Sequence, residues 1–246
     1  MSTAPVGLIV ALPEESQALR SVMRRVKPWS FPDYPAWRGV LGGREVVLTQ
    51  SGMGHGHAAA CARQLLRLER PALLIAAGFA GGLTDDFAPG DAIVASEVIL
   101  LEGTAHRRWP SRLKLEHASH RRAVLASPDR IMRFASEKQE LARLTGAQAC
   151  DMESGTVVRE AEEAGVPWLV VRSLTDGVAE DLPMDFQPFT NARGVPHKPR
   201  IVLHALVRPR TLWGLMRLGR RTAHAAHTLS RSVEQILSRV DQQLVP

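Results

Sequence analysis

The sequence has few cysteines and no long apolar run, and each lack excludes a class of protein. Two cysteines, Cys61 and Cys150, among 246 residues exclude a disulfide framework and favour a reducing compartment, so we expect a cytoplasmic protein. No apolar run reaches the roughly 18 residues that a membrane-spanning helix needs. Because no basic residue precedes the first apolar run, we expect no signal peptide at the N-terminus.

Acidic residues are scarce in the last quarter of the chain. From Arg193 to Pro246 only Glu234 and Asp241 are acidic, against ten lysines and arginines, which gives this stretch a charge of +8. The rest of the chain holds 21 basic and 23 acidic residues and carries −2. The overall charge of +6 therefore belongs to the C-terminal quarter, where it indicates an anionic partner or surface.

The rest of the chain alternates apolar strands with amphipathic helices, and 45% apolar residues suffice for a sizeable core. The predicted strands span 6–12, 72–83, 91–100, 121–127, 147–153 and 166–176, with a hairpin at 35–50 around Gly42-Gly43. The predicted helices span 14–25, 54–70, 136–146, a segment after 153 and the tail from Pro199. This order predicts an α/β fold, a three-layer sandwich with a mixed central sheet.

We expect a catalytic domain over residues 1–198 and a basic helical extension, 199–246, packed on that domain. The Pro-rich stretch 181–199 is long for a loop in a compact domain, which predicts a lid or a mobile segment.

Five clusters of glycines and acids follow predicted strands, where α/β sheets collect ligands. They are Glu14-Glu15, Ser51-Gly52-Met53-Gly54, Gly78-Phe79-Ala80-Gly81-Gly82, Asp151-Met152-Glu153 and Thr175-Asp176. Each has a simpler reading. Glycines serve turns, Glu15 and Glu153 suit the first turn of a helix, and Asp176 suits a cap. The convergence of all five at one edge favours a binding site.

The stretches ALPEES, SGMGHGHAAA, GFAGGL, DMES and VVRSLTD resemble, in the same order, the nucleoside phosphorylase and nucleosidase superfamily. The likeness covers about residues 6–180 and is greatest to the methylthioadenosine/adenosylhomocysteine nucleosidases. It implies a partly barrel-like sheet, a homodimer, and cleavage of an N-glycosidic bond that releases adenine.

The resemblance also implies roles for individual residues. Glu153 would accept hydrogen bonds from the ribose hydroxyls, and Met152 would pack on the sugar. Asp176 would protonate the purine at N7, and Glu15 would activate water with Arg172 nearby.

The remaining substrate-binding positions come from the same resemblance. Leu12 and Met53 would line the pocket for the 5′ substituent. The other positions of the predicted substrate-binding set are Ser51, Gly52, Gly78, Phe79, Ala80 and Gly81.

The residue at position 79 departs from the family. Many members have serine there, whose hydroxyl helps to hold phosphate or water, whereas this chain has Phe79. A carboxylate at Glu15 also repels phosphate. We favour water as the nucleophile, with phosphate as the alternative co-substrate. We expect no other cofactor and no metal, because His204, His224 and His227 have no ligand partners in their pattern.

The Arg-rich tail, together with DMES and RSLTD, resembles the hopanoid-associated subfamily, whose members release adenine from adenosylhopane, a C35 lipid precursor. Apolar and basic residues alternate over 208–221, which predicts peripheral contact with the anionic inner face of a membrane. The alternative is simple packing of a helix on the sheet, which fits Leu229, Val233, Ile236 and Val240 better.

Two other readings stay open. The substrate could be methylthioadenosine, adenosylhomocysteine or futalosine. Alternatively, the chain could be a non-catalytic nucleoside sensor whose basic tail binds nucleic acid. The tail has Trp213 as its one aromatic residue, so support from base stacking is thin, and we expect no nucleic-acid partner.

Overall fold

The structure is a computed structural model, which describes residues 4–113 and 121–239. Its strands are β1 (Val6–Val10), β2 (Arg24–Pro28), β3 (Ala36–Leu41), β4 (Arg44–Gln50), β5 (Leu73–Gly82), β6 (Ala92–Glu102), β7 (Ala105–Pro110), β8 (Arg121–Ser127), β9 (Ala149–Cys150) and β10 (Trp168–Asp176). Its helices are α1 (Pro13–Val22), α2 (His55–Glu69), α3 (Ala135–Thr145), α4 (Ser154–Glu163), the 3₁₀ turn η1 (Gln187–Phe189), α5 (Lys198–Leu206) and α6 (Pro209–Leu237).

One mixed sheet joins the strands in the order β10-β6-β8-β9-β5-β1-β4-β3-β2, with β7 paired to β6. Because β10 also pairs with β5, the strands β5, β10, β6, β8 and β9 close into a ring. Strands β1, β4, β3 and β2 extend that ring as an open sheet, which contains the hairpin β3–β4 and ends at β2. The predicted mixed, partly barrel-like fold is confirmed.

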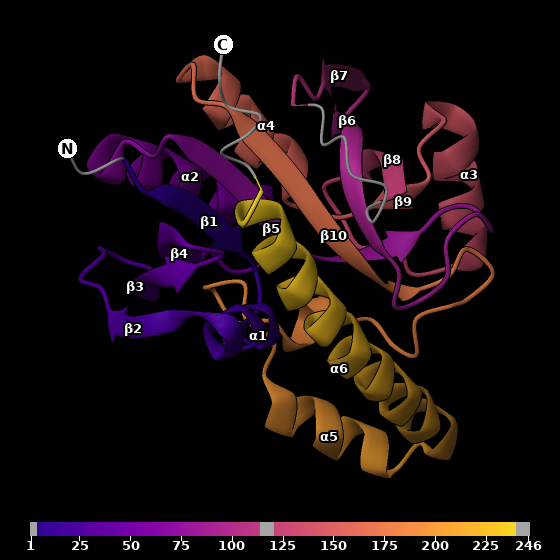
Figure 1. Ribbon diagram of the computed structural model, residues 1–246. Coiled ribbons are helices and arrows are strands. Elements are labelled where there is room, and N and C mark those ends of the chain that lie inside the picture. Colours follow the sequence, from indigo (N-terminus) through magenta and orange to yellow (C-terminus); the bar gives the residue numbers. More distant parts are fainter. Residues whose placement is uncertain (1–3, 114–120, 240–246) are drawn as a thin grey trace.

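Helices cover both faces of this sheet (Figure 1). Helices α2 and α4 pack together on one face, while α1 and α6 pack together on the other. Alternate residues of β1 enter the two cores: Ile9 joins the α2/α4 side, and Leu8 and Val10 join the α1/α6 side. Burial on both faces explains why the central strands read as continuous apolar runs.

The parallel strands β1, β5 and β10 position the candidate site. Strand β5 lies between the other two and pairs in parallel with both. Their carboxyl ends therefore meet at one edge, which carries Leu12 after β1, Phe79 in the last part of β5 and Asp176 at the end of β10.

Two strands differ from the sequence prediction. The helix expected over 14–25 ends at Val22, and the basic residues that follow form the exposed edge strand β2. Charged side chains suit such an edge because they discourage pairing with other chains. Between the predicted strands 91–100 and 121–127 the structure has a further strand, β7, which pairs with β6 across a turn at Gly103.

The helical tail divides at Pro209, which begins α6 and ends the run of α5. The second half of α6 buries Leu229, Val233 and Ile236 against the sheet, as expected, while Val240 lies outside the described residues. The first half of α6 projects beyond the sheet together with α5 (Figure 1). Within the described ranges, no helix combines the length and apolarity needed to cross a membrane.

The Pro-rich stretch 181–199 lies across the edge of the candidate site. The backbone N–H of Leu182 donates to Arg133 O at 2.8 Å, and the N–H of Met53 donates to Gly194 O at 2.9 Å. These backbone contacts attach the stretch to the body of the protein at two points.

Leu229→Ala should destabilise the protein by about 2–5 kcal/mol, because its side chain is fully buried between α6 and the sheet. Trp213→Ala, on the projecting half of the same helix, is the matched control. It should change the free energy of unfolding by no more than about 0.5 kcal/mol, because that side chain is 71% exposed. Urea unfolding measures both. Equal, small effects would show that α6 is not part of the folding core.

Candidate active site

One cleft of about 320 Å³ lies at the carboxyl ends of β1, β5 and β10. Most of the residues selected from the sequence line it: Leu12, Glu15, Met53, Phe79, Ala80, Gly81, Met152, Glu153 and Asp176. They come from segments more than 160 residues apart in the chain. The predicted convergence at one sheet edge is thus present in the structure.

Glu15 is held in the first turn of α1 by backbone donors. Its Oε2 accepts hydrogen bonds from the N–H groups of Ala11 and Leu12, each at 2.8 Å, and its Oε1 accepts one from Phe79 at 2.7 Å. Burial raises the pKa of the Glu15 carboxyl, and the nearby Arg172 guanidinium offsets part of this rise. The result is a fixed carboxyl group that is more basic than an exposed one.

Arg172 lies behind the cleft lining and holds the residues at the base of the cleft in place. Its guanidinium pairs with the Asp151 carboxylate and donates to Ser154 Oγ from Nη2 at 2.8 Å and from Nε at 3.1 Å. A Cβ atom at position 78 would lie 2.2 Å from Arg172 Nη1, so the close approach of this side chain requires Gly78. Arg172 and Gly78 therefore support the site from outside the cleft lining.

Asp151 fixes the start of α4 and, with it, Glu153. Its Oδ2 accepts hydrogen bonds from Ser154 N at 2.9 Å and from Glu153 N at 3.1 Å. The sequence analysis gave Asp151 no role of its own. Its position two residues before Glu153, at the N-terminus of a helix, is the signal that could have identified it as a capping acid.

Glu153 is a buried carboxyl group facing the cleft. Its Oε1 accepts a hydrogen bond from Gly54 N at 2.9 Å. Burial, with repulsion from the neighbouring Asp151, raises the pKa of Glu153 to about 8, although Arg172 opposes the shift. The site thus keeps a carboxyl group that is available to hydroxyl donors but is costly to ionise without one.

Asp176 is the last residue of β10, and it lines the cleft. Its Oδ1 accepts a hydrogen bond from Thr175 Oγ1 at 2.7 Å, and its Oδ2 accepts one from the ammonium group of Lys138. A Cβ atom at position 81 would lie 3.1 Å from Asp176 Oδ2, which explains the glycine there. The sequence analysis did not select Lys138, although a lysine stands in the apolar stripe of α3.

Ser51 and Gly52 do not line the cleft. The Ser51 hydroxyl group donates within the backbone, to Gly52 O at 2.8 Å and to Val10 O at 3.2 Å. A Cβ atom at Gly52 would lie 2.0 Å from Arg193 O, so this residue allows the 181–199 stretch to approach. Both residues shape the strand end that presents Met53.

A second set of cleft residues was not selected from the sequence. The outer part of the cleft is apolar, and its residues come from the 181–199 stretch, α5 and α6: Leu182, Phe186, Pro196, Ile201 and Leu218. Their periodicity resembles ordinary core packing, so the sequence alone gave no sign that they face a cavity. Among the described residues, no group of three His, Cys, Asp or Glu side chains could hold a metal ion.

The sequence pattern of the phosphorylase superfamily matches residues 5–206. The chain belongs to the phosphorylase superfamily. As a member, it is an enzyme of the nucleosidase and nucleoside phosphorylase kind, as the sequence predicted.

Curated relatives of this superfamily member include two 5′-methylthioadenosine/S-adenosylhomocysteine nucleosidases. That of Halalkalibacterium halodurans is 25% identical over 214 residues, which cover 77% of this chain and 93% of the relative. That of Shewanella oneidensis is 26% identical over 209 residues, which cover 75% and 89%.

Solved structures share the fold over nearly the whole chain. The 5′-methylthioadenosine/S-adenosylhomocysteine nucleosidase of Neisseria meningitidis, in complex with methylthio-immucillin-A, has a TM-score of 0.73 at 19% identity and covers 96% of this chain and 99% of its own. Futalosine hydrolase of Helicobacter pylori has a TM-score of 0.73 at 17% identity and covers 98% of both chains.

Glu153→Gln should stabilise this phosphorylase-superfamily protein at alkaline pH. Because its pKa is raised to about 8, the folded protein loses stability as pH rises from the ordinary glutamate value towards 8. The amide removes this loss but still accepts the Gly54 hydrogen bond. Thermal unfolding should show a gain of a few degrees at pH 9 and a much smaller gain at pH 5.

Glu140→Gln is the matched control, because Glu140 is an exposed carboxylate paired with Arg143. It should give no such gain. A gain for Glu153→Gln that is equal at both pH values would contradict the electrostatic explanation.

Proposed function

We propose that the enzyme hydrolyses the N-glycosidic bond of an adenosine with a large apolar 5′ substituent, with adenosylhopane as the substrate. One observation carries this proposal: a single cleft joins buried carboxyl groups at its inner end to an apolar wall at its outer end. The inner end suits a ribose and a purine, and the outer end suits a lipid.

The inner end provides the groups that bond cleavage needs. Glu153 accepts hydrogen bonds from the ribose hydroxyl groups and, when ionised, stabilises the cationic sugar of the transition state. The C1′–N9 bond breaks, and its electron pair goes to the purine. Asp176 donates its proton to N7, so that adenine leaves as a neutral base.

Glu15 activates the water that replaces adenine at C1′. Of its two oxygens, Oε1 accepts one backbone hydrogen bond and Oε2 accepts two, so Oε1 keeps a lone pair for water. The raised pKa of Glu15 suits a base that takes a proton from water. The products are adenine and a 5′-substituted ribose, and solvent returns the proton from Glu15 to Asp176.

Water fits the inner end better than phosphate does. Phe79 supplies no hydroxyl group, and Glu15 and Glu153 would repel a dianion. The Arg172 guanidinium, the cation behind Glu15, is already paired with Asp151 and bonded to Ser154. Hydrolysis is therefore the proposed reaction, with phosphorolysis as the alternative that the experiment below distinguishes.

The outer end offers apolar side chains to a 5′ substituent. Leu182, Phe186, Ile201 and Leu218 line it, and the apolar surface continues over the projecting α5. Val202, Leu203 and Leu206 on α5 and Val207 directly after it are 52%, 70%, 60% and 76% exposed. The part of a bound lipid that extends out of this cleft would lie beside an apolar surface of the protein.

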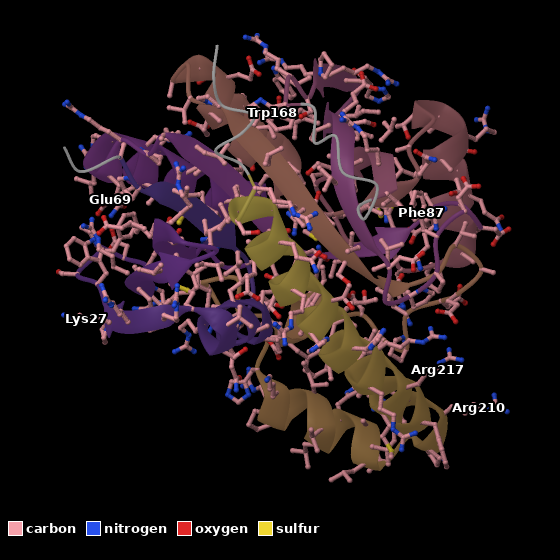
Figure 2. The ribbon with its side chains drawn as sticks, viewed as in Figure 1. Lys27, Glu69, Phe87, Trp168, Arg210 and Arg217 are labelled. Carbon is pink, nitrogen blue, oxygen red and sulfur yellow. The ribbon has the colours of Figure 1, made fainter. Side chains whose placement is uncertain are left out.

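We propose that this surface contacts an anionic membrane on its cytoplasmic face. The docking patch comprises Val202, Leu203, Leu206, Val207, Trp213 and Met216. Exposed arginines surround it at positions 200, 208, 210, 217 and 220, and each contributes about 1 kcal/mol near an anionic surface. Figure 2 shows Arg210 and Arg217 at the outer part of α6.

The patch differs from the one predicted over 208–221. Leu218 faces the cleft, and half of the exposed apolar residues, Val202, Leu203 and Leu206, belong to α5, which the sequence prediction did not include. The proposed membrane contact is therefore formed by the exposed apolar residues of two helices, α5 and α6, and not by a single interfacial helix.

Adenine release from adenosylhopane in detergent should exceed release from methylthioadenosine, as measured by chromatography of free adenine. The rate should not depend on phosphate. Asp176→Asn should lower kcat by at least roughly 10²-fold, because the amide cannot protonate N7. Asp129→Asn, outside the cleft lining, is the control and should leave the rate unchanged.

Release from methylthioadenosine, adenosylhomocysteine or futalosine, but not from adenosylhopane, would contradict the lipid substrate. A strict requirement for phosphate would contradict hydrolysis.

Flotation with vesicles that contain anionic phospholipid should recover the wild-type protein. A triple variant, Leu203→Ser, Leu206→Ser and Trp213→Ser, should bind at least about tenfold more weakly, because three apolar side chains no longer enter the bilayer. The double variant Leu68→Ser and Leu144→Ser, which changes exposed leucines outside the patch, is the control.

Equal binding by the triple variant would contradict the patch. Salt-dependent binding to DNA without vesicle binding would instead support a nucleic-acid partner. Light scattering in the same buffers would test the expected homodimer.

A further inference from the structure

Lys138 is a fully buried lysine beside the candidate acid. It lies on the inward face of α3 with Leu141 and Thr145, and its side chain is 1% exposed. Burying a charged ammonium group costs several kcal/mol of desolvation free energy unless hydrogen-bond acceptors surround it. A fully buried lysine is therefore a candidate for a specific role.

Three acceptors meet the three N–H bonds of this ammonium group. Lys138 Nζ donates to Asp176 Oδ2, to Gly177 O at 2.9 Å and to Glu180 O at 2.8 Å. All the donors of a charged lysine are therefore used, and none is left for a substrate. Lys138 acts through Asp176 rather than on the substrate.

The two contacts of Asp176 determine its orientation. Lys138 holds Oδ2, and the Thr175 hydroxyl group holds Oδ1 at 2.7 Å. Rotation about the bond to the carboxyl group would break both interactions. The carboxyl group is thus fixed while it lines the cleft.

Other ionisable groups lie near Asp176 on several elements, and some of them are paired with one another. Arg221 of α6 pairs with Glu180, and Arg172 of β10 pairs with Asp151. Burial raises the pKa of the Cys150 thiol, which therefore stays neutral. The remaining ionisable neighbours along the two clefts that Asp176 lines are Glu14, Glu15, Arg130, Glu153, Asp181, Lys198, Arg210 and Arg217. In the part of the chain that the structure describes, Lys138 is the cation in hydrogen-bond contact with Asp176.

We propose that Lys138 is a positioning residue that orients Asp176 and stabilises the carboxylate formed when Asp176 gives its proton to the purine. This inference rests on the proposed function in taking Asp176 as the acid. The proton moves from the Asp176 carboxyl group to N7, while Lys138 keeps its three protons throughout. Its fixed positive charge lies beside the negative charge that develops on Asp176.

Lys138→Met removes the charge and keeps an apolar side chain of similar length. We expect kcat for adenine release to fall on the order of 10²-fold, with KM changed much less. The alkaline limb of the pH–rate profile should move to higher pH, because the positive charge in contact with the acid has been removed. Lys138→Gln, which is also neutral but retains two N–H donors, should move the limb in the same direction.

Lys138→Arg restores the charge and should return the limb to the wild-type position. Lys27→Met, the same change on the exposed edge strand β2, is the control for the loss of one lysine. Thermal unfolding checks that each variant is folded. Neutral variants that are folded and keep the wild-type profile would overturn the proposal, as would a limb shifted equally in Lys138→Arg.

Adenine binding, measured by calorimetry across the same pH range, needs no turnover. In the wild type, adenine binding should be lost as pH rises, because it uses the proton that is given to N7. That loss should occur at higher pH in Lys138→Met and Lys138→Gln. Failure of the wild type to release adenine from any nucleoside would contradict the proposed function alone. An unchanged pH dependence of adenine binding in both neutral variants would overturn the role of Lys138.

Discussion

Four carboxyl groups are buried around one cleft, and their mutual repulsion is the constraint on which the rest of the site depends. Glu15, Asp151, Glu153 and Asp176 are all less than 9% exposed. Burial alone would oppose their ionisation, so the fold provides two buried cations and several backbone donors among them. Arg172 holds Asp151, Lys138 holds Asp176, and three N–H groups hold Glu15. Glu153 is left with the least compensation, and it is the group that a ribose would complete.

The fold supplies this arrangement by parallel pairing. Strands β1, β5 and β10 place three loops at one edge, and Gly78 and Gly81 let the side chains of Arg172 and Asp176 approach β5. The C-terminal helices then decide what else can enter. The buried half of α6 belongs to the core through Leu229 and Val233, while the projecting half and α5 line the outer cleft through Leu218 and Ile201. The same two helices thus place an apolar entrance beside the buried carboxyl groups of the cleft.

Much of the fold and of the candidate site could be predicted from the sequence, and the parts that could not be predicted have physical causes. The apolar runs of β1, β5 and β10 and the acids that follow strands identified the sheet edge and part of the cleft lining. The edge strand β2 escaped prediction because its basic, exposed residues carry no alternating apolar pattern. Lys138 was not predicted as a site residue because a lone lysine in an amphipathic helix is expected to be exposed. Only tertiary contacts show its three acceptors. The apolar residues of the outer cleft were not predicted either, because Ile201 and Leu218 look like ordinary core residues until the cavity beside them is known.

We propose that one cleft binds a ribosyl purine at its inner end and an apolar 5′ group at its outer end. The most direct test is the inhibition constant of immucillin-type adenosine analogues whose 5′-thioalkyl chain lengthens from methyl through butyl to octyl. The account predicts that affinity rises with each added methylene, by up to about 0.8 kcal/mol while the chain stays in the cleft. An affinity that is highest for the methyl compound and falls with length would contradict it.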